Sequence, residues 1–184
     1  MQHVMVVSEV ASLLRDHSGV KVNWANDNQW TALHYASWKG HVEVVKLLLA
    51  HPDINVNLKT RQGQTPFSLG CENGQVFVVR VLLNDPRVNI TLADRDGCTP
   101  LWWASWKGHH EVIEWLIASG RDLGEVKNKK GTDRDNCNEY TALEIARTNK
   151  KTEVVSLLER FMVNPAQTRH SLDSWMRWLL KSMP

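Results

Sequence analysis

The residues best suited to chemistry are a histidine–glutamate run and an aspartate-rich turn. His109, His110 and Glu111 are adjacent, whereas zinc ligands are spaced several residues apart along the chain. The run from Asp94 to Gly97 resembles the start of a calcium loop, but the third acidic position and the distal glutamate are absent. No nucleophile stands beside a general base. We therefore predict no catalytic residue, no metal site and no cofactor.

Cysteine content and charge narrow the function classes further. The cysteines are Cys71, Cys98 and Cys137, an odd number without a CxxC pair, which indicates a reducing, intracellular compartment. The net charge of +2 argues against a nucleic-acid partner. No signal peptide and no apolar run long enough to span a bilayer is present. We expect a monomer with no membrane span.

An internal repeat organises the chain. Four related segments begin at threonines, and the first three are spaced 34 residues apart whereas the last follows after 42. They are TALHYASWKGHVEVVKLLL from Thr31, TPFSLGCENGQVFVVRVLL from Thr65, TPLWWASWKGHHEVIEWLI from Thr99 and TALEIARTNKKTEVVSLLE from Thr141. Upstream, Val10, Leu13 and Leu14 match the second half of the repeat. The chain therefore opens inside a partial repeat.

Each segment predicts two short helices. Thr31 is suited to be an N-cap, and Gly40 is suited to end the first helix with a positive φ. Apolar residues at helical spacing, such as Val44 and Leu48, form the buried face of the second helix. Pro52 stands just past that helix, where it prevents continuation. One such unit cannot cover its apolar faces alone, so the units must stack.

These segments resemble ankyrin repeats in their Thr-Pro-Leu-His-like tetrapeptide, their Gly-His step and their closing leucines. The resemblance implies an all-α solenoid of stacked helix-turn-helix units with projecting β-turn fingers, acting as a protein-binding scaffold. The ankyrin-repeat domain would cover residues 1–161, with a partial repeat at 1–25 and repeats from about 26, 60, 94 and 136. The sequence departs from the family where Ser68, Trp102 and Glu144 replace the histidine, and where Gln29 and Glu139 replace the turn glycine.

The same resemblance places a binding groove along the first helices and the fingers. Its register puts Trp38-Lys39, Glu72-Asn73, Trp106-Lys107 and Thr148-Asn149 in one row. The residues before each threonine, Trp30, Gln64, Cys98 and Tyr140, form a second row. Because Glu72 and Thr148 occupy the positions of Trp38 and Trp106, the core does not require tryptophan there. We interpret the tryptophans as binding anchors for a protein or peptide. The candidate partner-binding residues are Trp30, Tyr35, Trp38, Lys39, Glu72, Asn73, Trp103, Trp106, Lys107 and Tyr140.

Three other interpretations of the aromatic residues stay open. Trp38 and Trp106 could simply cover neighbouring helices. The pairs Tyr35–Trp38 and Trp103–Trp106 are spaced to form a small cage for methylated lysine. Single-strand nucleic-acid binding would stack bases on the rings, but the near-neutral charge disfavours it. Elsewhere we expect Trp24 in packing, Trp102 half-buried and Trp115 in the core.

Two segments fall outside the regular repeat. Eight extra residues lie between Arg121 and Glu139, and we expect a surface loop there whose shortening does not unfold the protein. Residues 162–184 predict an amphipathic helix with Leu172, Trp175, Met176, Leu179 and Met183 on one face. We expect it to cap the stack, with an extension that binds elsewhere as the alternative.

Overall fold

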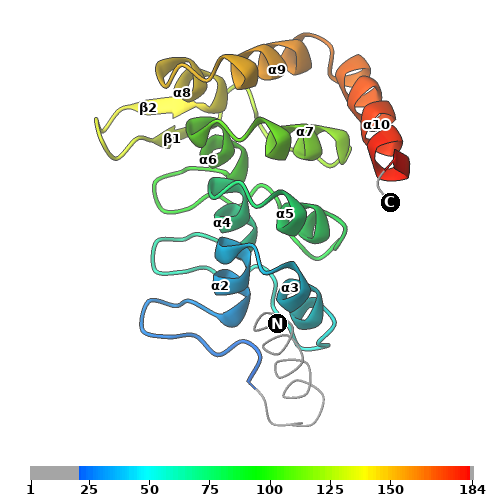
Figure 1. The fold of residues 1–184 in the computed structure, drawn as a ribbon. Helices are drawn as coiled ribbons and strands as arrows, with labels where there is room; N and C mark the ends of the chain where they lie inside the picture. Colours follow the sequence, from blue (N-terminus) through cyan, green and yellow to red (C-terminus); the bar gives the residue numbers. More distant parts are fainter. Residues whose placement is uncertain (1–20, 183–184) are drawn as a thin grey trace.

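The computed structural model describes residues 21–182 and shows helix pairs stacked along one direction (Figure 1). The first helices, α2, α4, α6 and α8, lie in one layer, and the second helices lie in the other. The pairs are α2 (Ala32–Lys39) with α3 (Val42–Leu49), α4 (Pro66–Glu72) with α5 (Val76–Leu83), α6 (Pro100–Lys107) with α7 (His110–Ala118) and α8 (Ala142–Thr148) with α9 (Thr152–Val163). The predicted all-α solenoid is confirmed. The partial repeat with Val10, Leu13 and Leu14 lies outside the described residues.

Equivalent apolar positions of successive repeats meet in one continuous core. The second helices bury a leucine at the same position of each repeat, each no more than 3% exposed: Leu48, Leu82, Leu116 and Leu158. The first helices carry small, buried residues where they pack on one another: Ala36, Gly70, Ala104 and Ala146. Small side chains let helix backbones approach closely, so each first helix can use its neighbours as walls.

Each first helix begins at its repeat threonine. The hydroxyl groups of Thr31, Thr65, Thr99 and Thr141 accept the backbone N–H three residues further on. In return, the side chains of His34, Ser68 and Glu144 accept the N–H of their threonines, at 3.1, 2.9 and 2.8 Å. The substitutions for the tetrapeptide histidine therefore keep one hydrogen bond with different acceptors. Trp102 cannot accept, and its indole Nε1 instead donates to the carbonyl oxygen of Tyr140 at 2.9 Å.

Short fingers connect the helix pairs. The first three are closed by N–H···O=C bonds of 3.0, 2.9 and 3.0 Å across residues 26–30, 60–64 and 94–98. Gln29, Gly63 and Gly97 take positive φ of 61°, 84° and 79°, so Gln29 replaces the turn glycine in geometry as well as in position. The fourth finger is a two-stranded antiparallel sheet of β1 (Lys130–Thr132) and β2 (Glu139–Thr141). Glu139 is therefore a strand residue, contrary to our prediction of a turn there, and the positive φ falls at Cys137.

The extra residues before the fourth repeat are mostly exposed, as expected of a surface loop, but they also contain regular structure. They include β1, and the guanidinium of Arg121 donates to the carbonyl oxygens of Leu83 and Val88 in the preceding repeat. That shortening does not unfold the protein stays a prediction, and trimming Lys127–Asp133 would remove β1.

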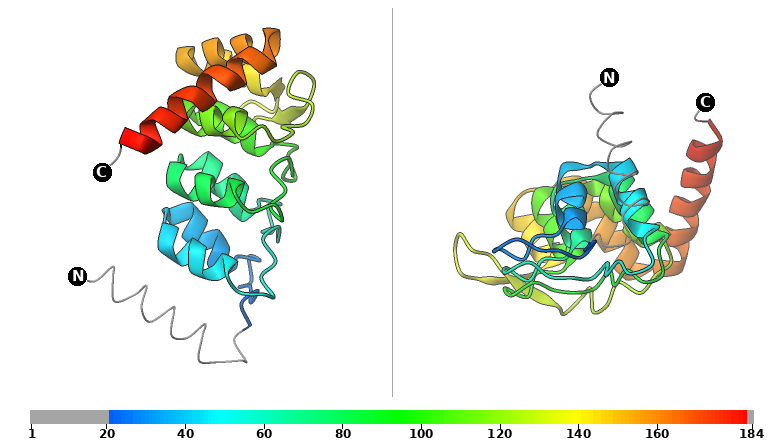
Figure 2. Two further views of the ribbon diagram at one scale, coloured as in Figure 1. Left: turned by 90° about the vertical axis from the view of Figure 1, so that its right-hand side faces the viewer. Right: turned by 90° about the horizontal axis from the view of Figure 1, so that it is seen from below.

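The chain ends in α10 (Pro165–Ser182), which packs against α7 and α9 beside the second-helix layer (Figures 1 and 2). Leu172 is 7% exposed on the packed side, and Trp175 is 43% exposed. Thr168 donates to the carbonyl oxygen of Arg160 at 3.1 Å and ties α10 to α9. The side chains of Met176 and Leu179, and the whole of Met183, lie outside the described residues. Within the described residues, no helix is long and apolar enough to cross a membrane.

Two tryptophans outside the predicted row differ from expectation. Trp24 is 66% exposed, so the packing role assigned to it is wrong. Trp102 is 2% exposed rather than half-buried, and Tyr140 of the fourth finger both packs against its cluster and accepts its indole N–H. Trp115 is partly buried against the core, and the guanidinium of Arg80 lies 4.4 Å from its ring centroid.

Lowering the pH should destabilise the protein through His34. This side chain is fully buried, and its Nε2 bonds to the carbonyl oxygen of Leu58 while Nδ1 accepts from Thr31, so the ring must be neutral. Burial lowers the pKa of His34 from 6.5 to about 4. Its stabilising contribution is thus complete above pH 6.5 and is lost as pH falls towards 4, by about 3 kcal/mol at most. Urea unfolding of the wild type and of His34→Gln across this range measures the difference; parallel curves would contradict the assignment.

The contact of α10 with α7 and α9 should contribute to stability. Truncating the buried Leu172 to alanine leaves a cavity, and we expect the free energy of unfolding to fall by about 2 kcal/mol. Trp175→Ala is the matched control, since the larger but exposed side chain should change the free energy by less. Chemical denaturation measures both variants, and a loss of stability for Trp175→Ala greater than for Leu172→Ala would reverse the assigned packing.

Candidate functional site

The candidate row lies on four neighbouring first helices. Trp38, Glu72 and Trp106 are half-buried and Thr148 is exposed, at equivalent positions near the ends of α2, α4, α6 and α8. Each first helix packs on the next, so these side chains follow one another along the stack. We call this surface, together with the fingers beside it, the inner face. None of the four positions belongs to the fully buried core, as the sequence comparison predicted.

Three aromatic side chains gather at the first repeat. The ring of Trp30 lies 4.9 Å from that of Tyr35 and 5.7 Å from that of Trp38, centroid to centroid. Tyr35 is 46% exposed, and Trp30 and Trp38 are half-buried. The ammonium of Lys39 lies 3.5 Å from the Trp38 ring centroid, within cation–π range. All four are among the residues that the sequence predicted as partner-binding, and the structure brings them together.

A second aromatic cluster forms at the third repeat. Trp103 and Trp106 meet edge-to-face, with centroids 5.2 Å apart, and Trp102 lies 5.3 Å from Trp103. The ammonium of Lys107 lies 3.9 Å from the Trp106 ring centroid, which repeats the arrangement of the first cluster. Trp103 is only 4% exposed, so it cannot offer a ring face to a partner, contrary to its prediction as a binding residue. Trp106 is half-buried and accessible.

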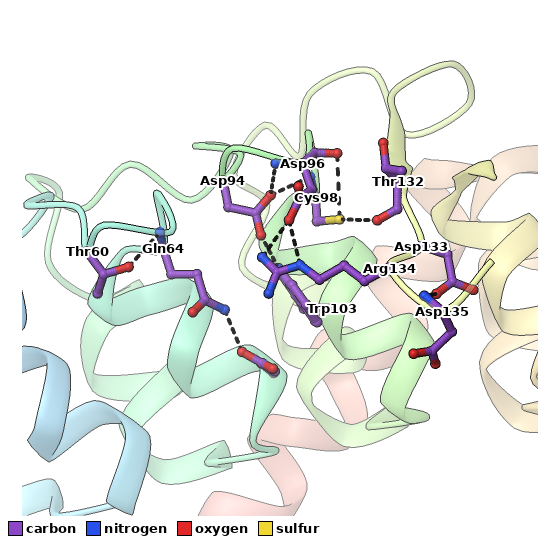
Figure 3. A network of polar contacts seen from close by, with 11 residues as sticks. Thr60, Gln64, Asp94, Asp96, Cys98, Trp103, Thr132, Asp133, Arg134 and Asp135 are labelled. Atoms are coloured by element: carbon purple, nitrogen blue, oxygen red, sulfur yellow. Dashed lines mark hydrogen bonds and ion pairs between the residues drawn. The ribbon is translucent and has the colours of Figure 1, made fainter. Parts of the chain in front are cut away.

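A carboxylate in the third finger accepts the N–H of the buried Trp103 indole (Figure 3). Asp94 Oδ2 accepts the indole N–H of Trp103 at 3.0 Å, and Oδ1 accepts the backbone N–H groups of Asp96 and Cys98. Burial raises the pKa of Asp94, and these hydrogen bonds to the charged form partly offset that rise. A buried indole needs an acceptor, and Asp94 supplies it.

Glu72 stands between the two aromatic clusters. Its Oε2 accepts from the Gln64 amide at 2.6 Å, which joins the two predicted rows. Burial raises the pKa of Glu72, while this hydrogen bond and the charges of Lys107 and Arg134 lower it. The neighbouring Asn73 is exposed but donates its amide to the carbonyl oxygen of Leu69 at 2.9 Å. The middle of the inner face therefore carries an acidic group where its flanks carry indoles and ammonium groups.

The fourth finger covers the second cluster. Arg134 pairs with Asp96 at 2.5 Å, and its guanidinium carbon lies 5.9 Å from the Trp103 ring centroid. The half-buried ring of Tyr140 packs against the same cluster, while its hydroxyl accepts from the side chain of Asn136 at 3.4 Å. Sequence reasoning missed Arg134 and Asp94, because their roles depend on contacts between fingers. The eight-residue insertion was the available signal for Arg134, and the sequence carries no comparable signal for Asp94.

His109 has a structural role between two repeats. His109 lies at the turn before α7, and its Nε2 bonds to the carbonyl oxygen of Glu72 in the previous repeat at 3.0 Å. Gln75, at the equivalent position, donates to the carbonyl oxygen of Trp38 at 3.0 Å. Within the described residues, no group of three or more His, Cys, Asp or Glu side chains could hold a metal ion.

The cysteines near the inner face are poor nucleophiles. Burial raises the pKa of the Cys71 and Cys98 thiols far above their usual range, so both stay protonated near neutral pH. The arrangement offers aromatic faces, ammonium groups and a carboxylate. These groups suit recognition by contact and charge.

A comparison with protein-family models agrees with the geometry. The model for ankyrin repeats in three copies matches residues 2–60 and 51–127, which together span more than half of the chain. The match includes most of both aromatic clusters and begins upstream of the described residues. A search of curated proteins finds no match.

The fourth finger should depend on Gly131. A Cβ at this position would lie 2.7 Å from the Sγ and 2.9 Å from the Cα of Cys98, so the two fingers would have to separate. We expect Gly131→Ala to lower the free energy of unfolding by about 1–3 kcal/mol. Glu139→Ala, an exposed change in the same sheet, is the control. Thermal denaturation compares them, and equal melting temperatures for Gly131→Ala and wild type would exclude close packing of the fingers.

Proposed function

Because the chain belongs to the ankyrin-repeat family, we propose that it binds a protein or a peptide across its inner face without catalysing a reaction. Ankyrin repeats are generally protein–protein interaction modules and are typically non-catalytic. The family supplies the functional class. The location of the site is our inference from the surface of α2, α4 and α6.

The repeated, accessible Trp-Lys pair carries this proposal. Trp38 and Trp106 occupy the same position of two repeats, and each keeps part of its ring open to solvent. Each ring is supported by other aromatic rings, at 5.7 Å from Trp30 and 5.2 Å from Trp103. Large, pre-positioned indoles of this kind dominate the affinity of many interfaces, because they bury much apolar area and lose little freedom on binding.

The same geometry makes a methyl-lysine reader the less favoured function. The ammonium of Lys39 already lies over the Trp38 ring and would compete with a methylammonium, and Trp103 is buried. A shared cage of Trp38 and Trp106 is disfavoured, because α4 lies between their helices and a cation must lie within about 6 Å of each ring. Single-strand nucleic-acid binding is also less favoured, because the acidic side chain of Glu72 stands at the centre of the row, where a negatively charged strand would lie.

Removal of both anchors should abolish partner binding. The intact chain and the Trp38→Ala/Trp106→Ala double variant are used as baits in a lysate of the cells that make the protein, and retained proteins are quantified by mass spectrometry. We expect a partner retained by the wild type to be lost by the double variant, with a fall in affinity of at least about a hundredfold for two hot-spot residues.

Phe77→Ala is the matched control for this experiment. Phe77 is an aromatic residue 58% exposed on the second-helix layer, so its loss should leave the inner face intact. Melting temperatures of all variants establish that the fold is retained. Retention of every partner by the double variant would refute the inner face as the binding site.

A further inference from the structure

The lysines beside the indole anchors indicate which charged groups a partner carries. Lys39 and Lys107 are exposed, and their ammonium groups lie 3.5 and 3.9 Å from the ring centroids of Trp38 and Trp106. Within the described part of the chain, neither group pairs with a carboxylate oxygen within 4.0 Å. Two cations are thus held in defined places without an ion pair, and Lys107 has a longer-range interaction with the Glu72 carboxylate.

Helix capping does not use these ammonium groups. Lys39 and Lys107 stand in the last turns of α2 and α6, where a cation interacts favourably with the helix dipole. However, both helices are closed by left-handed glycines, and the carbonyl oxygen of Trp38 is bound by the Gln75 amide. The ammonium groups fold onto the rings instead. A cation–π contact leaves the side of the ammonium that faces away from the ring open to an anion.

We propose that the inner face binds an acidic segment of its partner, with one carboxylate at Lys39 and a second at Lys107. This inference rests on the proposed function and gives its partner a chemistry. The apolar part of the segment packs on Trp38 and Trp106, and the carboxylates replace water around the two ammonium groups. Charge complementarity of this kind fixes the register of a bound chain.

The stack sets the spacing of the two carboxylates. Lys39 and Lys107 stand two first helices apart, and packed helices lie about 8–10 Å apart, so the lysines are separated by roughly 16–20 Å. An extended chain rises about 3.3 Å per residue, so the acids stand about five or six residues apart. Glu72 faces the middle of the segment and repels a further acid there. The recognised pattern is therefore acid, a non-acidic interval, acid.

Two synthetic peptides of identical composition test this pattern. One carries two glutamates about six residues apart with glutamine and leucine between them, and the other carries the glutamates side by side. Quenching of tryptophan fluorescence in the intact chain measures affinity. We expect the spaced peptide to bind at least about tenfold more tightly, and its affinity to fall as salt is added. Equal affinities, or equally tight binding of single-stranded DNA, would overturn the proposal.

Reversing the charge of Lys39 and Lys107 tests whether these two lysines cause the preference for the spaced peptide. Lys39→Glu/Lys107→Glu should abolish the preference for the spaced peptide, and Lys39→Gln/Lys107→Gln should weaken it. Lys127→Glu/Lys129→Glu makes the same change in net charge on exposed lysines outside the two aromatic clusters, and should retain the preference. Equal losses in both glutamate variants would show a general charge effect and overturn the proposal. Melting temperatures should change little, because all four side chains are exposed.

Retention of the captured partner by the two double variants distinguishes failure of this inference from failure of the proposed function. If the partner is lost by Trp38→Ala/Trp106→Ala but retained by Lys39→Glu/Lys107→Glu, the inner face binds and the acidic-segment proposal is wrong. If both double variants retain the partner, the proposed function itself fails. If both double variants lose the partner, and the segment of the partner that contacts the inner face carries two acids at this spacing, the proposed function and the acidic-segment proposal are both supported.

Discussion

Burial of apolar side chains between neighbouring repeats is the interaction on which this structure depends. No single helix pair can enclose its own leucines, and Leu82 and Leu116 reach 0% and 1% exposure because adjacent pairs wall them in. The same requirement explains the small residues Ala36 and Gly70, which let the first helices approach. A larger side chain in that layer would push two repeats apart, so the stack constrains these positions more than any property of one repeat.

Hydrogen bonds between repeats fix the alignment of each repeat on the next, which burial of apolar side chains alone would not specify. Gln75 and His109 each bond to a carbonyl oxygen in the preceding repeat, at 3.0 Å in both cases. These side chains satisfy carbonyl groups at the ends of the first helices, which would otherwise need water. The side chains at positions 38 and 72 are therefore not needed to satisfy these carbonyl groups. Position 38 can be tryptophan and its equivalent in the next repeat glutamate, because neither closes a helix nor fills the core.

The sequence predicts what is repeated and fails where a role depends on one long-range contact. Helix pairs, threonine caps and the row from Trp38 to Trp106 follow from periodicity, because each repeat supplies the same local forces. Trp103 has the same helical spacing to Trp106 as Tyr35 has to Trp38, yet it is buried. The equivalent residues Leu69 and Ile145 are buried as well. What Trp103 adds is an indole N–H, which Asp94 of the third finger accepts, and a contact with Arg134 of the fourth finger. No local pattern distinguishes that aspartate from a turn residue.

That buried contact also affects the accessible anchor. Trp103 is held by its bond to Asp94, and Trp106 packs edge-to-face on it with centroids 5.2 Å apart. The Trp106 ring therefore has few alternative rotamers to lose when a partner binds, and each rotamer-rich side chain ordered at an interface costs about 0.5–1.5 kcal/mol. Trp38 is held in a similar way by Trp30. The clustering of indoles thus has one physical consequence at both ends of the inner face: a supporting ring orders the anchor before binding begins.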